Sequence, residues 1–277
     1  MGVPEAAPAA AWDPGQYLRY ADERSRPFFD LLAPVPAAAA SLVVDLGCGP
    51  GTLTRTLAQR WPDAEIVGVD SSEEMISRAA SEAGFARLSY VCADLRSWLR
   101  TDSADLGAPD VVVANAVLQW VPGHLALIEP IASWLAPGGT FAFQVPANFD
   151  SPSHTVIREL RESPRWRDRV GARADRQAGV ESPETYLEAL AAAGLEPDVW
   201  QTTYLHRLTG ENPVLEWVKG TALRPVLTAL AGDEAESEAF LAECAEGLRD
   251  AYPAGADGTT VFPFRRTFAI GTAKAAA

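Results

Sequence analysis

Residues 42–52 read Leu42-Val-Val-Asp-Leu-Gly-Cys-Gly-Pro-Gly-Thr52, and they decide the fold. The stretch begins as a short apolar run, which is typical of a buried strand. Three glycines at alternate positions follow, directly before a helical segment. Glycine has no Cβ, so such a turn lets a ligand approach the backbone in the crevice at the carboxyl end of a sheet. The stretch therefore predicts a ligand-binding turn between a first strand and a first helix.

Strand and helix patterns alternate after this turn. Further strands are expected over 65–70, 88–92, 111–114 and 140–145, with helices over 52–60, 71–83 and 128–135. Such alternation predicts an α/β fold with a doubly wound, mostly parallel sheet of the Rossmann-like type. We expect an N-terminal helical cap and a C-terminal helical insertion around this sheet. The expected divisions are 1–40, a disordered leader and helical cap; 41–208, the ligand-binding core; 209–260, a substrate-covering helical insertion; and 261–277, a closing strand and disordered tail.

The composition restricts the partners. The 277 residues are 48% hydrophobic and carry a formal net charge of −14. Such a field repels nucleic acid and anionic membranes, and no apolar stretch is long enough to span a bilayer. Residues 1–11 lack the features of a signal peptide, so we expect a cytoplasmic protein. We also expect a monomer or small homo-oligomer that acts on a small molecule. Cys48, Cys92 and Cys244 are scattered singly, which predicts neither a disulfide framework nor a metal site.

Two carboxylates identify the ligand of the turn. A dinucleotide fingerprint requires a third glycine where Thr52 stands, and Asp45 would repel a pyrophosphate. S-adenosylmethionine has no phosphate, and its ammonium group suits a nearby carboxylate. Asp70 ends the second strand, where a carboxylate can accept hydrogen bonds from both ribose hydroxyls. The alternative for Asp70 is an exposed turn residue that caps the next helix.

The positions after the later strands resemble those of class I methyltransferases. Asp94-Leu95 resembles the segment that binds the adenine amino group, and Asn115 stands where that family places a residue near the methionine moiety. The turn at 135–140, Leu-Ala-Pro-Gly-Gly-Thr, also matches. Asp94 as a helix cap and Asn115 as a structural turn residue are the alternatives. The expected cofactor-binding residues are Asp45, Gly47, Cys48, Gly49, Gly51, Asp70, Ser71, Met75, Asp94, Leu95, Asn115 and Leu118.

Beyond this core the chain resembles trans-aconitate methyltransferases along most of its length. The matching stretches are 12–20 (Trp-Asp-Pro-Gly-Gln-Tyr-Leu-Arg-Tyr), 23–27, 114–120 (Ala-Asn-Ala-Val-Leu-Gln-Trp), 200–204, 221–225 and, more loosely, 262–266. The resemblance implies methyl transfer from S-adenosylmethionine to one carboxylate of trans-aconitate, which yields a monomethyl ester and S-adenosylhomocysteine.

This chemistry requires orientation rather than a general base, because a carboxylate is already ionised at pH 7. Charge-assisted hydrogen bonds from arginine would clamp the other carboxylates. The expected substrate-binding residues are Tyr20, Arg26, Gln119, Trp120, Tyr204, Arg224 and Arg266. The alternatives are a core position for Tyr20, an ion pair with Glu23 or Asp22 for Arg26, and surface positions for Arg224 and Arg266. His206 is expected to be structural, and only one of Arg265 and Arg266 should face the substrate.

Two other functions stay open at this stage. The loop at 147–181 matches the family less clearly, and the Arg-rich run 161–176 could reflect another small acid or a natural product as acceptor. A solvated charged run is the alternative interpretation of those arginines. The glycine turn by itself is also compatible with a protein that binds S-adenosylmethionine without turnover.

Overall fold

The structure, a computed structural model, describes residues 21–36, 39–82, 84–101, 103–170 and 179–275. Its contacts group into two compact units. The first, the sheet unit, contains the described residues of 22–147, 179–202 and 265–275. The second, the helical unit, contains residues 148–170 and 203–264. The expected leader at 1–11, the first part of the expected helical cap and Tyr20 all lie outside the described residues.

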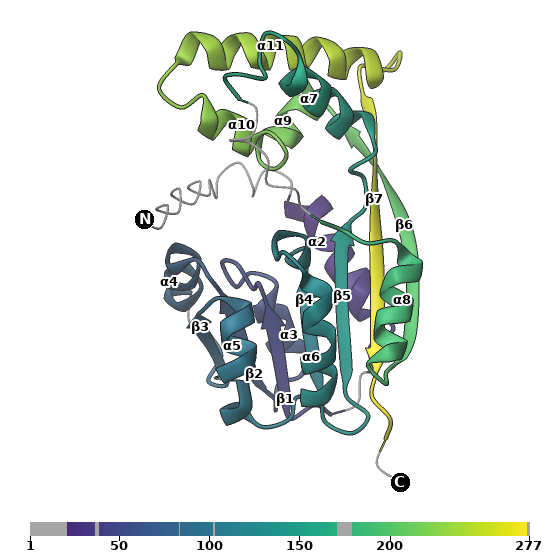
Figure 1. The fold of residues 1–277 in the computed structure, drawn as a ribbon. Coiled ribbons are helices and arrows are strands. Elements are labelled where there is room, and N and C mark those ends of the chain that lie inside the picture. Colours follow the sequence, from purple (N-terminus) through teal and green to yellow (C-terminus); the bar gives the residue numbers. More distant parts are fainter. Residues whose placement is uncertain (1–20, 37–38, 83, 102, 171–178, 276–277) are drawn as a thin grey trace, which may run out of the picture. The chain divides into compact units, whose positions relative to one another are not determined.

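The described residues form a seven-stranded sheet in the order β3-β2-β1-β4-β5-β7-β6 (Figure 1). Its strands are β1 (Leu42–Leu46), β2 (Glu65–Asp70), β3 (Leu88–Cys92), β4 (Val111–Asn115), β5 (Thr140–Pro146), β6 (Glu196–Leu208) and β7 (Thr260–Thr272). Strands β1 to β5 pair in parallel, and β7 runs antiparallel to β5. The predicted Rossmann-like, mostly parallel α/β fold is confirmed.

Helices cover both faces of this sheet. They are α2 (Ala21–Leu32), α3 (Thr54–Arg60), α4 (Glu73–Ser81), α5 (Leu95–Thr101), α6 (Ile128–Trp134) and α8 (Pro183–Ala192). Figure 1 shows α5, α6 and α8 in front of the sheet and α2 and α3 behind it. On the front face, Trp98, Ile131 and Tyr186 join one buried cluster with Val112 and Phe141 of the strands. The apolar strands thus bury both faces, as a parallel sheet requires.

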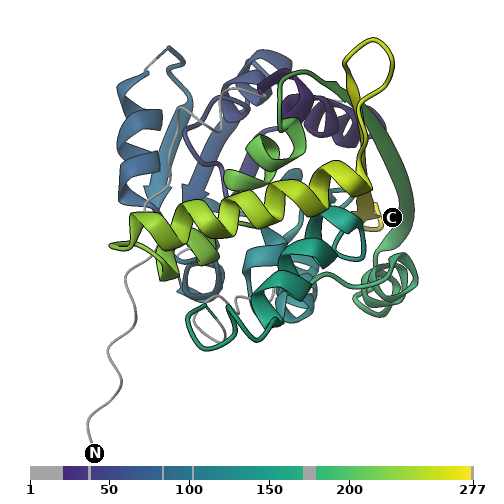
Figure 2. The same ribbon diagram turned by 90° about the horizontal axis from the view of Figure 1, so that it is seen from above.

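The helical unit contains α7 (Pro152–Glu162), α9 (Pro213–Lys219), α10 (Arg224–Ala229) and α11 (Glu234–Ala251). Helices α7 and α11 lie side by side (Figures 1 and 2). They approach closely at Gly247, where a Cβ would stand 2.8 Å from a methyl group of Val156. Helix α7 occupies part of the segment that the sequence analysis treated as the loop 147–181.

The arginine run at 161–176 is described as far as residue 170, and that part forms ion pairs. Arg165 pairs with Glu243, and Arg169 pairs with Glu236, both on α11. The indole of Trp166 also donates to Glu243, at 3.0 Å. These contacts support a structural role for the described part of the run. Within the residues that the structure describes, every helix is too short or too polar to cross a bilayer.

Candidate active site

The glycine turn connects β1 to α3 at the carboxyl end of the sheet. Gly47, Gly49 and Gly51 have φ values of +73°, +54° and +73°, which L side chains rarely adopt. A Cβ at Gly47 would lie 2.4 Å from Val117, and one at Gly51 would lie 2.4 Å from the hydroxyl of Tyr90. A Cβ at Gly49 would meet nothing within 4 Å. Two of the glycines therefore serve packing, whereas Gly49 exposes its backbone to open space that a ligand can enter.

Asp70 is bound on both carboxylate oxygens by backbone amides. Gly49 N–H donates to Oδ2 at 2.9 Å, and Ser72 N–H donates to Oδ1 at 2.9 Å. The cap of α4 is Ser72, whose hydroxyl accepts from Met75 N–H at 3.3 Å. Each carboxylate oxygen can accept more than one hydrogen bond, so Asp70 keeps acceptor capacity while its position is fixed. Of the neighbouring expected residues, Met75 is buried and Ser71 is exposed.

Asp45 is buried at the end of β1, with 3% of its surface exposed. The Thr54 hydroxyl donates to its Oδ2 at 2.7 Å. Burial, together with the charge of Asp70, raises the pKa of Asp45 to about 7. Burial and these two carboxylates also raise the pKa of the Cys48 thiol, so Cys48 stays protonated and is not a nucleophile. A cation bound beside Asp45 would stabilise its ionised form.

Asp94 caps α5 from the position after β3. Its Oδ1 accepts from the amides of Arg96 and Ser97 at 3.1 Å and 3.2 Å. Burial is the largest single influence and raises its pKa, but the hydrogen bonds from Ser97 and Arg96 and the charge of Arg96 together outweigh it and lower the pKa overall. The capping role proposed as the alternative is therefore present. Leu95 points its side chain into the core, so any contact that it makes with a ligand would come from its backbone.

A strained turn follows β4. Ala116 has a φ of +53°, unusual for a residue with a Cβ, and its N–H donates to the Gln144 carbonyl at 2.9 Å. Gln119 donates from Nε2 to the Ala116 carbonyl at 2.7 Å, and its buried Oε1 has no hydrogen-bond partner among the described residues. Leu118 is buried in the hydrophobic core, whereas 51% of the Trp120 surface is exposed. Strain and a buried acceptor at one turn are typical of a functional site.

Arg266 reaches the same end of the sheet from β7. It is 6% exposed, and its Nη1 donates to Gln144 Oε1 at 3.1 Å. Gln144 in turn donates from Nε2 to Asn115 Oδ1 at 2.7 Å. Arg265 instead donates from Nε to the Ala147 carbonyl at 2.8 Å. The structure therefore places Arg266, not Arg265, in the polar network at the ends of β4 and β5, and it contradicts the surface alternative for Arg266.

The remaining expected substrate residues are less closely grouped. Arg26 is exposed on α2 and forms an ion pair of 3.6 Å with Asp30, one turn later. Tyr204 and Arg224 belong to the helical unit. Tyr204 is buried and stacks with His206, which fits the structural role expected for that histidine. Arg224 is half-buried and opens helix α10. The site role of each of these residues stays a prediction.

Three contributors to the site escaped the sequence analysis. They are Gln144, which links Arg266 to Asn115; Thr54, which binds Asp45; and Tyr90, whose hydroxyl donates to the Gly51 carbonyl at 3.4 Å. Gln144 had a detectable signal, because it is a polar residue inside the apolar run Phe141-Ala-Phe-Gln-Val145, at the carboxyl end of a strand. Thr54 and Tyr90 carried no comparable signal, since their roles depend on contacts across the fold.

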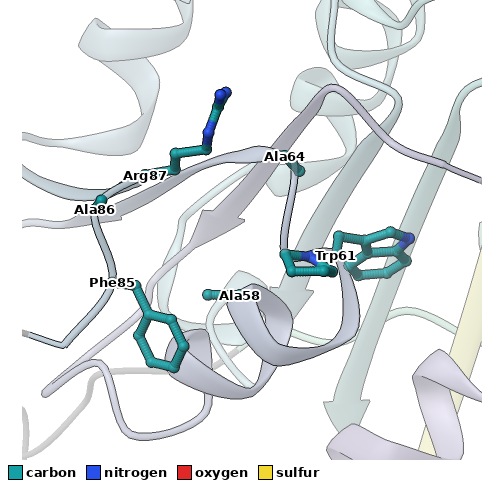
Figure 3. A pocket seen from close by; sticks show the side chains of 7 residues that line it. Ala58, Trp61, Ala64, Phe85, Ala86 and Arg87 are labelled. Atoms are coloured by element: carbon teal, nitrogen blue, oxygen red, sulfur yellow. The ribbon is translucent and has the colours of Figure 1, made fainter.

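A separate pocket of about 150 Å³ lies at the other end of the strands (Figure 3). Its lining includes Ala64, directly before β2, and Phe85, Ala86 and Arg87, the three residues before β3. These positions are at the amino ends of parallel strands, whereas open α/β sheets bind ligands at the carboxyl ends. We therefore assign the pocket no part in the reaction.

Comparisons with known proteins identify the family of this chain. A methyltransferase-domain family profile matches residues 17–199. The chain is 54% identical over 274 residues to a trans-aconitate 2-methyltransferase of Streptomyces avermitilis, covering 97% of this chain and 98% of that protein. It is 49% identical to one of Rhodococcus jostii, covering 94% and 98%. The YcgJ protein of Bacillus subtilis shares the fold with a TM-score of 0.56 at 15% identity, covering 90% of this chain and 98% of that one. The chain belongs to the trans-aconitate methyltransferase family.

Proposed function

We propose that this enzyme transfers the methyl group of S-adenosylmethionine to one carboxylate of trans-aconitate. The observation that carries the proposal is the 54% identity, over nearly the whole of both chains, to a relative named for that activity. The products would be a monomethyl ester and S-adenosylhomocysteine. The carboxylate oxygen forms a bond to the methyl carbon, and the carbon–sulfur bond breaks with its electron pair remaining on sulfur.

The turn after β1 suits the proposed methyl donor. Gly49 leaves room for a ligand against the backbone, and the Asp70 carboxylate is held rigidly enough to accept from ribose hydroxyls. The buried Asp45 suits a nearby ammonium group, because a cation would offset the cost of its ionisation. Asp94-Leu95 and Asn115 would complete the donor site, at the adenine and at the methionine moiety. The donor supplies an activated methyl group, and the protein supplies its orientation.

The acceptor side requires positive charge in an acidic protein. Arg266 is a buried cation at the carboxyl end of the sheet, which suits it to a charge-assisted hydrogen bond with a carboxylate. No general base is needed, since the attacking carboxylate is ionised at neutral pH. Catalysis would then come from holding oxygen and methyl carbon at attack distance in a site shielded from water. Gln119 and Trp120 are proposed to contact the acceptor beside the methyl group.

Further contacts to the acceptor are proposed from segments that the family resemblance covers. These residues are Tyr20, Arg26, Tyr204 and Arg224. The support for these four residues is the resemblance of the sequence segments that contain them to the trans-aconitate methyltransferase family.

Turnover with a panel of acceptors tests the proposal. The protein is incubated with methyl-labelled S-adenosylmethionine and trans-aconitate, cis-aconitate, citrate or a neutral phenol, and the products are measured by mass spectrometry. We expect a monomethyl ester, with the highest kcat/KM for trans-aconitate. A higher kcat/KM for another acid would reassign the acceptor, and preference for the phenol would refute the role of Arg266. Tight donor binding without turnover of any acceptor would indicate a non-catalytic binding protein.

A further inference from the structure

Three polar side chains form a hydrogen-bonded row across neighbouring strands of the sheet unit. Arg266 of β7 donates to Gln144 of β5 at 3.1 Å, and Gln144 donates to Asn115 of β4 at 2.7 Å. Arg266 and Gln144 are 6% and 1% exposed, and Asn115 is half-buried. The row therefore begins at a buried cation and ends where β4 meets the strained turn.

The chemistry of the three groups fixes the direction of every bond. A guanidinium group only donates, so the Gln144 atom that faces Arg266 must be the oxygen. The Gln144 atom that faces Asn115 must then be the nitrogen, which only donates, and Asn115 must meet it with its oxygen. It follows that Nδ2 of Asn115 points away from Gln144. Arg266, acting through Gln144, thus determines which end of the Asn115 amide stays available to a partner outside the row.

The backbone holds this row in place. Asn115 and Gln144 are direct partners in the β4–β5 register, so their side chains lie on the same face of the sheet. The next amide along, that of Ala116, donates to the Gln144 carbonyl at 2.9 Å. Val117 follows, and a Cβ added to Gly47 of the glycine turn would stand 2.4 Å from its side chain. The end of the row therefore lies next to the proposed donor site.

We infer that Gln144 is a positioning residue, which makes Asn115 present N–H donors rather than a carbonyl oxygen to a ligand carboxylate. The inference rests on the proposed function, because both proposed ligands carry carboxylates. The carboxylate can belong to the methionine moiety of the donor or to the acceptor. A reversed Asn115 amide would place a carbonyl oxygen against that carboxylate and repel it.

Substitutions at Gln144 test the direction of the row. Gln144→Glu keeps an acceptor for Arg266 but removes the donor to Asn115, so the Asn115 amide should turn over. Gln144→Met removes both bonds without adding charge. The matched control is Gln201→Glu, the same change at a residue of β6 that donates to Thr267 at 3.0 Å and lies outside the row.

Calorimetry with two ligands distinguishes the source of the carboxylate. S-adenosylhomocysteine carries the amino-acid carboxylate, and 5′-methylthioadenosine lacks the amino-acid group. If the donor is the partner, Gln144→Glu should raise the Kd of S-adenosylhomocysteine at least tenfold and change that of 5′-methylthioadenosine less than twofold. If the acceptor is the partner, both Kd values should hold while the acceptor KM rises at least tenfold. Gln144→Met should shift the same quantity by a smaller factor, and Gln201→Glu should shift none.

Two results would overturn the inference. The first is a folded Gln144→Glu variant with both Kd values and the acceptor KM within twofold of the parent. The second is a loss with Gln144→Glu but none with Gln144→Met, since charge repulsion alone would then explain it. If Gln144→Met does not fold, Asn115→Ala replaces it and must show the same selective loss. The calorimetric measurements need no turnover, so failure of the proposed trans-aconitate activity would be seen separately, as absence of ester.

Discussion

Gly51→Ala should mainly lower stability and Gly49→Ala should mainly weaken ligand binding, although both residues belong to one turn. Both positions have positive φ, +54° and +73°, so each substitution forces a Cβ into the left-handed region at about 1–2 kcal/mol. At Gly51 the new methyl group would also stand 2.4 Å from the Tyr90 hydroxyl and 2.9 Å from Ala79. Overpacking of that kind adds about 1–3 kcal/mol. At Gly49 nothing lies within 4 Å, so this second contribution is absent.

Gly51→Ala should therefore lower the free energy of unfolding by about 2–5 kcal/mol, and Gly49→Ala by only about 1–2 kcal/mol. Urea unfolding of the ligand-free protein, followed by circular dichroism, measures both. Alanine also makes the unfolded chain less flexible than glycine does, which adds to the free energy of unfolding. This gain is common to the two variants, so it cancels when their free energies of unfolding are compared. Calorimetry should show the reverse order for the ligand. The Kd for S-adenosylmethionine should rise at least tenfold in Gly49→Ala, because its methyl group enters the space left for the ligand.

Equal loss of stability in the two variants would refute the assignment of Gly51 to packing. Unchanged affinity for S-adenosylmethionine in Gly49→Ala would refute the assignment of Gly49 to the ligand. The double variant Gly51→Ala/Tyr90→Phe checks the steric argument, since removal of the hydroxyl should recover part of the stability lost.

Three further substitutions test the carboxylates and the acceptor side. Asp70→Ala should raise the Kd for S-adenosylmethionine about 10- to 150-fold, because it removes hydrogen bonds worth ~1.5–3 kcal/mol. It should also lower the free energy of unfolding, because two backbone amides lose their acceptor. Unchanged affinity in calorimetry would contradict the ribose role. Asp45 has a pKa raised from 3.8 to about 7, so the folded state holds its proton longer than the unfolded state, and the free energy of unfolding should fall as the pH rises from about 4 to about 7. In urea unfolding at several pH values, Asp45→Asn should remove this fall in the free energy of unfolding. It should also remove any gain in affinity for S-adenosylmethionine that the parent protein shows as the pH rises through 7. Arg224→Ala should raise the KM of the acceptor far more than that of the donor. The control is Arg207→Ala, which removes an exposed partner of Asp257 and should change neither KM. Equal effects of Arg224→Ala on both KM values would point to a folding defect.

The local signals in the sequence were sufficient for the fold. The strand expected over 65–70 has those bounds in the structure, and the strand over 88–92 does too. Such runs are predictable because alternation of apolar strands and capped helices is written into neighbouring residues. The helix at 152–162 was missed, because its surroundings, rich in proline and arginine, weaken the periodic pattern. The long strands β6 and β7 begin at Glu196 and Thr260, a few residues before the strands that the apolar pattern predicts over 199–208 and 262–272.

The candidate site divides in the same way. The glycine turn and Asp70 could be found by spacing, because the turn and the end of the next strand belong to one strand–helix–strand unit of nearly constant length. The burial of Arg266 rather than Arg265 could not be predicted in this way, because it depends on which face of β7 is covered. The link through Gln144 depends on three strands that are distant in sequence.

The order of residues was sufficient to predict a Rossmann-like sheet with a glycine turn after β1, because both follow from local periodicity and from glycines at fixed positions. It also determined the family, through segments outside the turn. The assembled fold was needed to show that Gly47 and Gly51 pack closely against other side chains while Gly49 faces open space, because all three have similar φ angles and differ in what surrounds them. It was also needed to show that the buried Arg266 of β7 is linked by hydrogen bonds through Gln144 to the amide of Asn115, two strands away. Hydrogen bonds between distant strands have no signature in the order of residues; they form only when the sheet has been assembled.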